Sequence, residues 1–235
     1  MQQLKELHKI CVMGDSILKS VIFNEEAGRY TFMKEGAVYA FERAHDVEVV
    51  NYAKFGCTIP KGYEKLRQVL EKGDSSEAVL IEFGGNDCDY DWDAVAAAPL
   101  APHTPNTPYG QFTETLDRMI ALVQDYGKRP FVMNLPPISH ERYFQWISKG
   151  DAKRAENLLT FLKNENIIYR HQEYYSRALE LAAMRHGLYI VNVRDAFLPI
   201  QDYDSYLCVD GIHPNEKGQR MIQDVFARSY AELFS

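Results

Sequence analysis

Residues 9–16 read KICVMGDS, an apolar run that ends in a Gly-Asp-Ser turn. Four more short, mainly apolar runs follow along the chain, at about residues 47–52, 78–83, 130–135 and 188–193. Runs of this length and composition are typical of strands that are buried on both faces. We therefore predict five strands, of which residues 9–13 form the first.

Longer stretches with apolar residues at helical spacing separate these runs. They cover about residues 32–45, 63–72, 112–126, 164–185 and 216–234. Strands that alternate with helices form a parallel sheet with helices on both faces. The chain is thus expected to be an α/β protein, a three-layer α/β/α sandwich around a five-stranded parallel sheet. In such folds, ligands gather beyond the carboxyl ends of the strands.

Two segments interrupt the alternation, residues 87–110 and 136–151. We predict that both are long loops that leave carboxyl ends of strands and therefore border one pocket. Their aromatic and histidine residues are candidate substrate contacts, namely Trp92, His103, His140, Tyr143 and Trp146. Because no internal repeat or linker divides the sequence, we expect one domain over residues 1–235.

The composition argues against several classes of partner. With 26 Lys+Arg against 33 Asp+Glu, the net charge is -7, and no dense basic block suggests nucleic-acid binding. No apolar run approaches the roughly 18 residues of a membrane helix, so membrane insertion is not expected. Residues 1–9 lack the apolar core of a signal peptide, which predicts a soluble cytoplasmic protein. The cysteines have no CxxC spacing and are expected to be free thiols: Cys11, Cys57, Cys88 and Cys208.

The Gly-Asp-Ser turn is the first candidate for chemistry. Ser16 follows the first strand, so its hydroxyl would lie exposed at the ligand edge of the sheet. A serine becomes nucleophilic when a neighbouring base removes its proton. On its own, however, Gly-Asp-Ser is also an ordinary turn and helix-cap sequence.

The segment VDGIHPN, residues 209–215, offers that base after the last strand. His213 can accept the serine proton, and Asp210 can hold the other ring nitrogen and stabilise the imidazolium. Gly211 permits a tight turn between them, and Pro214 suits the start of the last helix. The alternative is an aspartate that caps this helix beside a surface histidine.

Two further segments supply hydrogen-bond donors at the same edge. Gly56 follows the second strand, and Asn86 in GGND (residues 84–87) follows the third. Ester hydrolysis passes through a tetrahedral oxyanion that needs fixed donors. The backbone N–H groups of Ser16 and Gly56 and the side-chain amide of Asn86 are our candidates, with Asp15 as a tentative substrate contact.

These four segments, in this order, resemble the blocks of the SGNH (GDSL-type) hydrolase family. Ser16, Gly56, Asn86 and His213 with Asp210 match the blocks one by one, and Ile17 stands where the GDSL name has Leu. The resemblance implies a flavodoxin-like sandwich and a two-step acyl transfer that uses no metal or cofactor. It leaves the substrate open among carbohydrate acetyl groups, lysophospholipids, thioesters and aryl esters.

Our leading hypothesis is an esterase for short acyl groups, such as O-acetyl groups on carbohydrates, because sugars stack on aromatic side chains. A lysophospholipase or thioesterase is the alternative, for which residues 96–102 would line an acyl groove. An inactive binding module and a metal-assisted phosphoesterase using Asp15, Asn86 and His213 are the others. The aspartates of residues 87–93 do not form a calcium loop, since Trp92 and Ala98 replace the required Gly and Glu. The remaining histidines are expected at the surface or in helices: His8, His45, His171 and His186.

Overall fold

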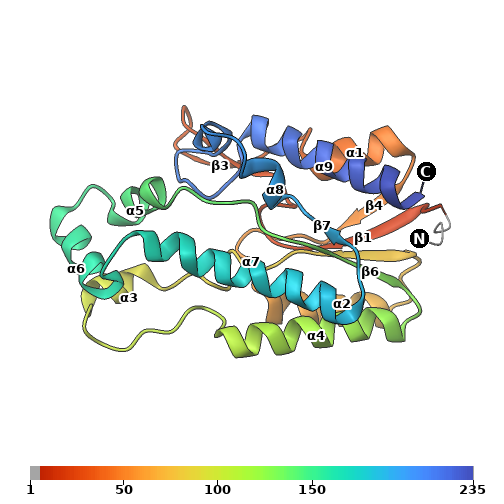
Figure 1. The fold of residues 1–235 in the computed structure, drawn as a ribbon, viewed down its shortest axis with the longest axis horizontal. Helices are drawn as coiled ribbons and strands as arrows, with labels where there is room; N and C mark the ends of the chain where they lie inside the picture. Colours follow the sequence, from red (N-terminus) through yellow and green to blue (C-terminus); the bar gives the residue numbers. More distant parts are fainter. Residues whose placement is uncertain (1–5, 235) are drawn as a thin grey trace.

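A five-stranded parallel sheet lies at the centre of the computed structural model, which describes residues 6–234 (Figure 1). Residues 1–5 of the polar leader lie outside the described part. The strand order is β4-β1-β5-β6-β7, and every neighbouring pair is parallel. The strands are β1 (Lys9–Met13), β4 (Glu48–Asn51), β5 (Ala78–Ile81), β6 (Arg129–Met133) and β7 (Ile190–Val191). The sequence-based prediction of five parallel strands is confirmed.

Helices cover both faces of this sheet because alternate strand residues point to opposite sides. Cys11 and Met13 face one core, with α2 (Ile59–Glu71), α4 (Tyr109–Asp125) and α7 (Asn166–His186). Ile10 and Val12 face the other core, whose helices are α1 (Ala37–His45), α8 (Arg194–Phe197) and α9 (Glu216–Phe234). The three-layer sandwich is therefore as predicted.

A hairpin precedes the expected helix 32–45 and overlaps it only at Phe32. Strands β2 (Val21–Asn24) and β3 (Arg29–Phe32) pair antiparallel, and Gly28 turns between them with a φ of +58°. The helix itself begins only at Ala37. Sequence analysis assigned no element to residues 17–31, although β-branched and aromatic residues on both sides of a turn with glycine are typical of a hairpin.

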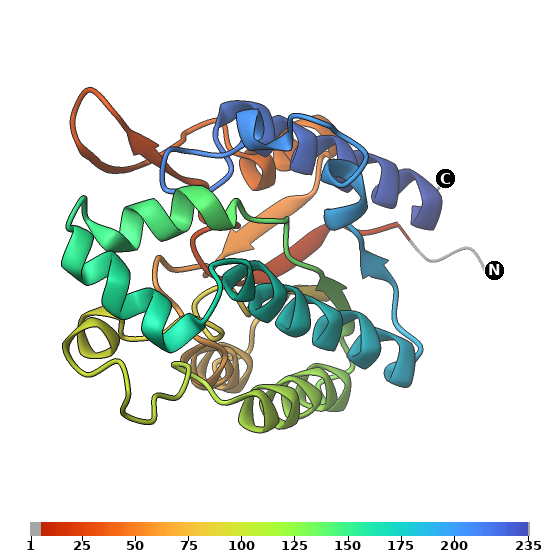
Figure 2. The ribbon, with the colours of Figure 1, turned by 60° about the vertical axis from the view of Figure 1, so that its left-hand side comes forward.

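The two predicted long loops are wrong in detail, since each contains a helix. Residues 87–110 include α3 (Trp92–Ala97), which Asp91 caps by accepting the N–H groups of Asp93 and Ala94. Residues 136–151 include α5 (His140–Ser148), and α6 (Ala152–Leu162) follows directly. With the start of α7, these helices form a third apolar cluster beyond the carboxyl ends of the strands (Figures 1 and 2).

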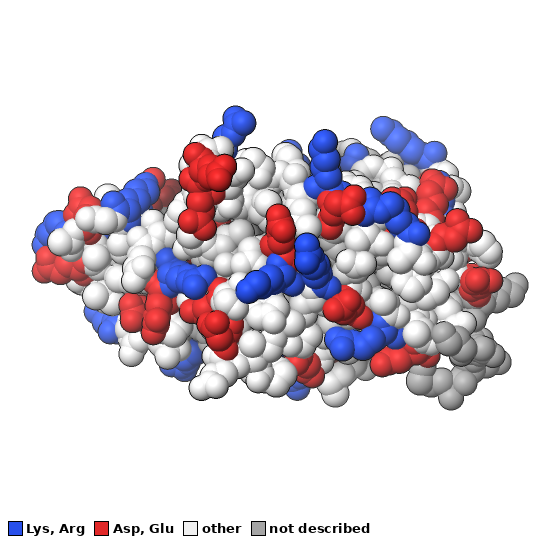
Figure 3. Space-filling model, turned by 90° about the horizontal axis from the view of Figure 1, so that it is seen from above, with Lys and Arg blue, Asp and Glu red and all other residues white. Residues whose placement is uncertain are grey.

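Charged side chains of both signs share the surface that Figure 3 shows. On the face that Figure 3 shows, acidic and basic side chains are interspersed, without a large patch of one sign. All four cysteines are free thiols. Within residues 6–234, no helix combines the length and apolarity needed to cross a membrane.

Candidate active site

Ser16 lies just beyond β1 in a turn that its neighbours hold in place. Asp15 accepts the N–H of Ile17 through Oδ1 at 2.9 Å, and this bond closes the turn. Position 14 requires a glycine, because a Cβ there would lie only 2.9 Å from Oε2 of Glu82. Ser16 itself is largely buried, and its side chain borders a cavity.

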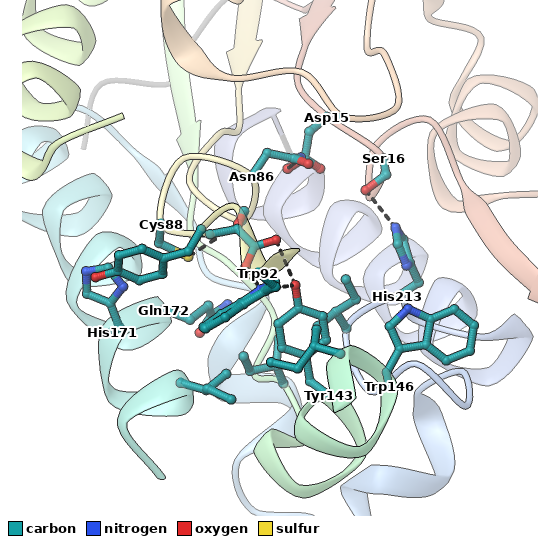
Figure 4. A pocket seen from close by; sticks show the side chains of 18 of the residues that line it. Asp15, Ser16, Asn86, Cys88, Trp92, Tyr143, Trp146, His171, Gln172 and His213 are labelled. Carbon is teal, nitrogen blue, oxygen red and sulfur yellow. Dashed lines mark hydrogen bonds between the residues drawn. The ribbon is translucent and has the colours of Figure 1, made fainter. Parts of the chain in front are cut away.

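His213 meets Ser16 across the sheet edge. The ring nitrogen Nε2 lies 2.9 Å from Oγ of Ser16, and Nδ1 lies 2.6 Å from Oδ2 of Asp210 (Figure 4). Both contacts are hydrogen bonds when Nδ1 carries the proton and the Ser16 hydroxyl donates to Nε2. Gly211 makes the tight turn between Asp210 and His213, with a φ of +75° that few other residues adopt.

The carboxylate of Asp210 is held as an anion although it has no access to solvent. Its Oδ1 accepts the backbone N–H groups of Ile212 at 3.0 Å and His213 at 3.1 Å. Burial alone would raise the pKa of Asp210, but these bonds and the His213 imidazole outweigh it, so the pKa lies below its usual value. Asp210 therefore stays ionised at neutral pH.

The candidate oxyanion donors line the same cavity as Ser16 and His213. Asn86 donates from Nδ2 to Oδ2 of Asp15 at 2.9 Å, and its carbonyl accepts Nδ2 of Asn106 at 2.9 Å. Because an amide has two N–H groups, Asn86 can donate to Asp15 and to a reacting oxygen at once. Gly56 has a φ of +70°, and a Cβ there would meet open space.

A group of buried carboxyls lies behind this turn, and sequence reasoning missed its centre, Glu82. Oε2 of Glu82 accepts the N–H of Asp15 at 3.3 Å. Burial, together with the charge of Asp15, raises the pKa of Glu82 well above its usual value, and burial raises that of Asp15 as well. Of the two carboxyls, Glu82 is thus the one that holds a proton more readily. Oδ1 of Asp87 accepts the N–H of Ile59 at 2.9 Å, so this carboxyl joins the loops after β4 and β5.

The cavity has a volume of about 550 Å³ and extends well beyond Ser16. It runs from His213 and Trp146 past Asn86 to His171 (Figure 4). We call its far end the inner arm, which is lined by Tyr90, Phe161, Leu162, Ile167, Ile168 and His171. Helices α6 and α7 supply most of these residues, so the arm is built by segments that the sequence did not mark as pocket walls.

Trp92 and Tyr143 line the cavity between its two ends (Figure 4). Asp89 accepts Nε1 of Trp92 at 2.6 Å and the hydroxyl of Tyr143 at 2.7 Å. Burial raises the pKa of Asp89 to about 6 in spite of these bonds. Asp89 therefore accepts hydrogen bonds from the polar atoms of both aromatic residues, whose rings line the cavity.

Four of the six tentative substrate contacts line the cavity: Asp15, Trp92, Tyr143 and Trp146. The other two, His103 and His140, lie elsewhere. His103 bonds the carbonyl of Ala98 at 2.8 Å and packs edge-on against Phe161, and His140 is the half-buried first residue of α5. Neither is among the described residues that line the cavity. His171 does line it, although we expected only a surface or helix position.

An aromatic rim, defined as Tyr30, Phe55 and Trp146, surrounds His213 at the mouth of the cavity. The ring centroids of Tyr30 and Phe55 lie 5.1 Å and 5.9 Å from that of His213. Phe55 and Trp146 remain 45% and 37% exposed, which leaves the rim open to a ligand. Sequence analysis did not identify Tyr30, because it did not predict the hairpin that carries this residue.

A serine, an imidazole and a buried carboxylate in hydrogen-bond contact at the edge of a parallel sheet define the class of α/β serine hydrolases. Within this class, residues 12–221 match the model of the GDSL-like Lipase/Acylhydrolase family. The chain belongs to this family of carboxylic ester hydrolases.

Solved structures with this fold include a lipase/acylhydrolase from Enterococcus faecalis, with a TM-score of 0.68, 19% identity and 97% coverage of both chains. A catalytic mutant of an acetylxylan esterase from Geobacillus stearothermophilus has a TM-score of 0.65, 18% identity and coverages of 97% of this chain and 96% of that one. The psychrotrophic esterase EstA from Pseudoalteromonas sp. has a TM-score of 0.60 and 18% identity, with 96% and 97% covered. At these identities the likeness establishes the fold alone. No curated protein matches the chain.

Proposed function

We propose that the protein hydrolyses carboxylic esters through an acyl-enzyme on Ser16, with His213 as general base and Asp210 as its partner. The observation that carries this proposal is the unbroken path from Oγ of Ser16 to Nε2 of His213 at 2.9 Å and from Nδ1 to Asp210 at 2.6 Å. Each contact lies within the range over which a proton is transferred or an imidazolium is stabilised.

The reaction then follows from these positions. His213 takes the hydroxyl proton as Oγ of Ser16 attacks the ester carbonyl, and Asp210 stabilises the imidazolium. The resulting oxyanion receives the N–H groups of Ser16 and Gly56 and the amide of Asn86. His213 next gives its proton to the leaving alcohol. A water molecule, activated by the same histidine, finally releases the acid.

The same positions support a division of the substrate between two parts of the cavity, the alcohol in one and the acyl group in the other. His213 must reach both Oγ of Ser16 and the leaving oxygen, so the alcohol lies on the His213 side, at the aromatic rim. The acyl group then points away from His213, past Asn86 and towards the inner arm (Figure 4).

An O-acylated carbohydrate fits the rim. The open faces of Phe55 and Trp146 offer stacking surfaces for a sugar that leaves as the alcohol. On this basis we keep the short-acyl carbohydrate ester as the leading substrate class. A cytoplasmic location stays a prediction from the sequence.

The inner arm favours a second candidate, a longer acyl chain, as in a lysophospholipid or thioester. Its walls include four apolar side chains from α6 and the start of α7: Phe161, Leu162, Ile167 and Ile168. Residues 96–102, which we expected to line such a groove, are not among the described residues of the cavity. An acyl group longer than acetyl would bury its extra methylenes here, at roughly 0.8 kcal/mol each.

Measurement of kcat/KM for p-nitrophenyl esters from acetyl to dodecanoyl distinguishes the short-acyl substrate from the long-acyl one. A maximum of kcat/KM at acetyl or propionyl supports the short-acyl proposal, and a maximum at octanoyl or beyond refutes it. Ile167→Trp, which fills the arm, should lower the rates on long esters and leave acetyl ester hydrolysis unchanged. The exposed Met184→Trp on the same helix α7 is the matched control.

A further inference from the structure

The hairpin β2–β3 is tied to the turn that carries Ser16. Its first residue, Val21, donates its N–H to the carbonyl of Ser16 at 3.0 Å, and Met33 beyond its end donates to the carbonyl of Ser20 at 2.9 Å. On its other side the hairpin packs on the segment before His213, where the N–H of Phe23 donates to Sγ of Cys208 at 3.4 Å. The hairpin therefore bridges the two segments that supply the proposed nucleophile and base.

Tyr30, on the second strand of this hairpin, reaches the proposed triad. Its hydroxyl donates to Oδ2 of Asp210 at 3.0 Å. This is the same oxygen that faces Nδ1 of His213 at 2.6 Å. One carboxylate oxygen thus accepts from both the imidazole and the phenol.

We infer that Tyr30 is a positioning residue that sets the basicity of His213 through Asp210, an inference that rests on the proposed function. A hydrogen bond from the phenol stabilises the Asp210 anion and draws charge from the oxygen that faces the imidazole. Asp210 then stabilises the imidazolium less than it would without this hydrogen bond. The Tyr30 hydroxyl should therefore let His213 act as a base at a lower pH than it could in the absence of that hydroxyl. The same bond helps to hold Oδ2 in the position where Nδ1 meets it.

The phenol remains a donor throughout the range in which the enzyme would work. Burial and the neighbouring Asp210 both raise the pKa of Tyr30 above its usual value. Its ring also packs against other parts of the site, with centroid distances of 5.2 Å to Phe23 and 6.2 Å to Trp146. These contacts fix the ring independently of the hydroxyl, so Tyr30→Phe should remove the hydrogen bond alone.

Other groups around the pair act from different elements and stay in place in this variant. Asp15 interacts with His213 from the end of β1, and Cys208 lies close to Asp210 from the segment before it. Arg142 of α5 directs its guanidinium to the carbonyls of Asp204 and Leu207, at 2.7 and 3.4 Å. Because none of these groups changes, a shift in the pH profile reports on the Tyr30 hydroxyl.

The test compares pH profiles of kcat/KM for the wild type and Tyr30→Phe. The acid limb should move to higher pH by about half a unit or more. Tyr189→Phe is the control, since Tyr189 also donates to a carboxylate, Glu232, at 2.6 Å, and it packs on the core helix α9 away from the cavity. Its profile should match the wild type. An acid limb that stays in place in Tyr30→Phe overturns the inference, even if kcat falls.

A second measurement does not depend on turnover. In Ser16→Ala protein, the His213 ring protons are titrated by NMR with and without the added Tyr30→Phe change. The midpoint should rise in the double variant, and an unchanged midpoint contradicts the inference. A wild type without esterase activity would refute the proposed function itself, whereas an active wild type with an unmoved Tyr30→Phe profile refutes only the role of Tyr30.

Discussion

Asp210→Asn should abolish most of the esterase activity and leave the fold intact. Oδ1 of Asp210 accepts the N–H groups of Ile212 and His213 at 3.0 and 3.1 Å, and an asparagine keeps these bonds only if its own oxygen takes that place. The new NH₂ group then replaces Oδ2, which lies 2.6 Å from Nδ1 of His213. A donor there forces Nδ1 to be the acceptor, so the imidazole carries its proton on Nε2, facing Ser16.

In that tautomer His213 cannot take the serine proton. The imidazolium would also lose a counter-charge that solvent cannot replace, because Asp210 is fully buried. A wrong tautomer of this kind lowers kcat by about 10⁴-fold, which corresponds to roughly 5 kcal/mol of transition-state stabilisation. We expect this loss in steady-state hydrolysis of p-nitrophenyl acetate, with circular dichroism as the control for folding. A folded Asp210→Asn enzyme within ten-fold of the wild-type kcat would refute the assignment.

Three further predictions concern neighbouring residues of the site: Asn86, Glu82 and Asp89. Asn86→Ala should lower kcat by about 10²–10³-fold with little change in KM, because the Asn86 amide acts on the oxyanion. An effect confined to KM would contradict this role. Glu82→Gln, which mimics the protonated acid, should keep kcat within about two-fold at neutral pH, whereas Glu82→Ala should lose activity and about 1–3 kcal/mol of stability. Asp89 has a folded-state pKa of about 6, above its unfolded value, so the folded state holds the proton more tightly. Its contribution to the free energy of unfolding should fall as pH rises from about 4 to about 6, measured by urea denaturation, and Asp89→Asn should remove this slope.

The sheet and the proposed triad were predictable because each rests on a local pattern. The five strands are short apolar runs. Ser16 and Asn86 lie shortly after β1 and β5, and His213 lies shortly before α9. Parallel strands bring their carboxyl ends together, so the sequence order was enough to place these residues at one edge.

The walls of the site were less predictable because they depend on tertiary packing. Helices α3 and α5 are only 6 and 9 residues long, which gives too few turns for a clear apolar period. Tyr30 contacts Asp210 across 180 residues of sequence, and no local pattern links them. His171 lies mid-helix in α7, where its direction into the cavity depends on how that helix packs.

The identity of the nucleophile is the central claim, and covalent labelling tests it most directly. A fluorophosphonate reacts with a serine that a neighbouring base has activated. After labelling of the folded protein, mass spectrometry of the peptides should place the adduct on Ser16, and the adduct should be missing from folded Ser16→Ala. An adduct on another residue, or an unlabelled Ser16 in protein that still hydrolyses esters, would contradict the account.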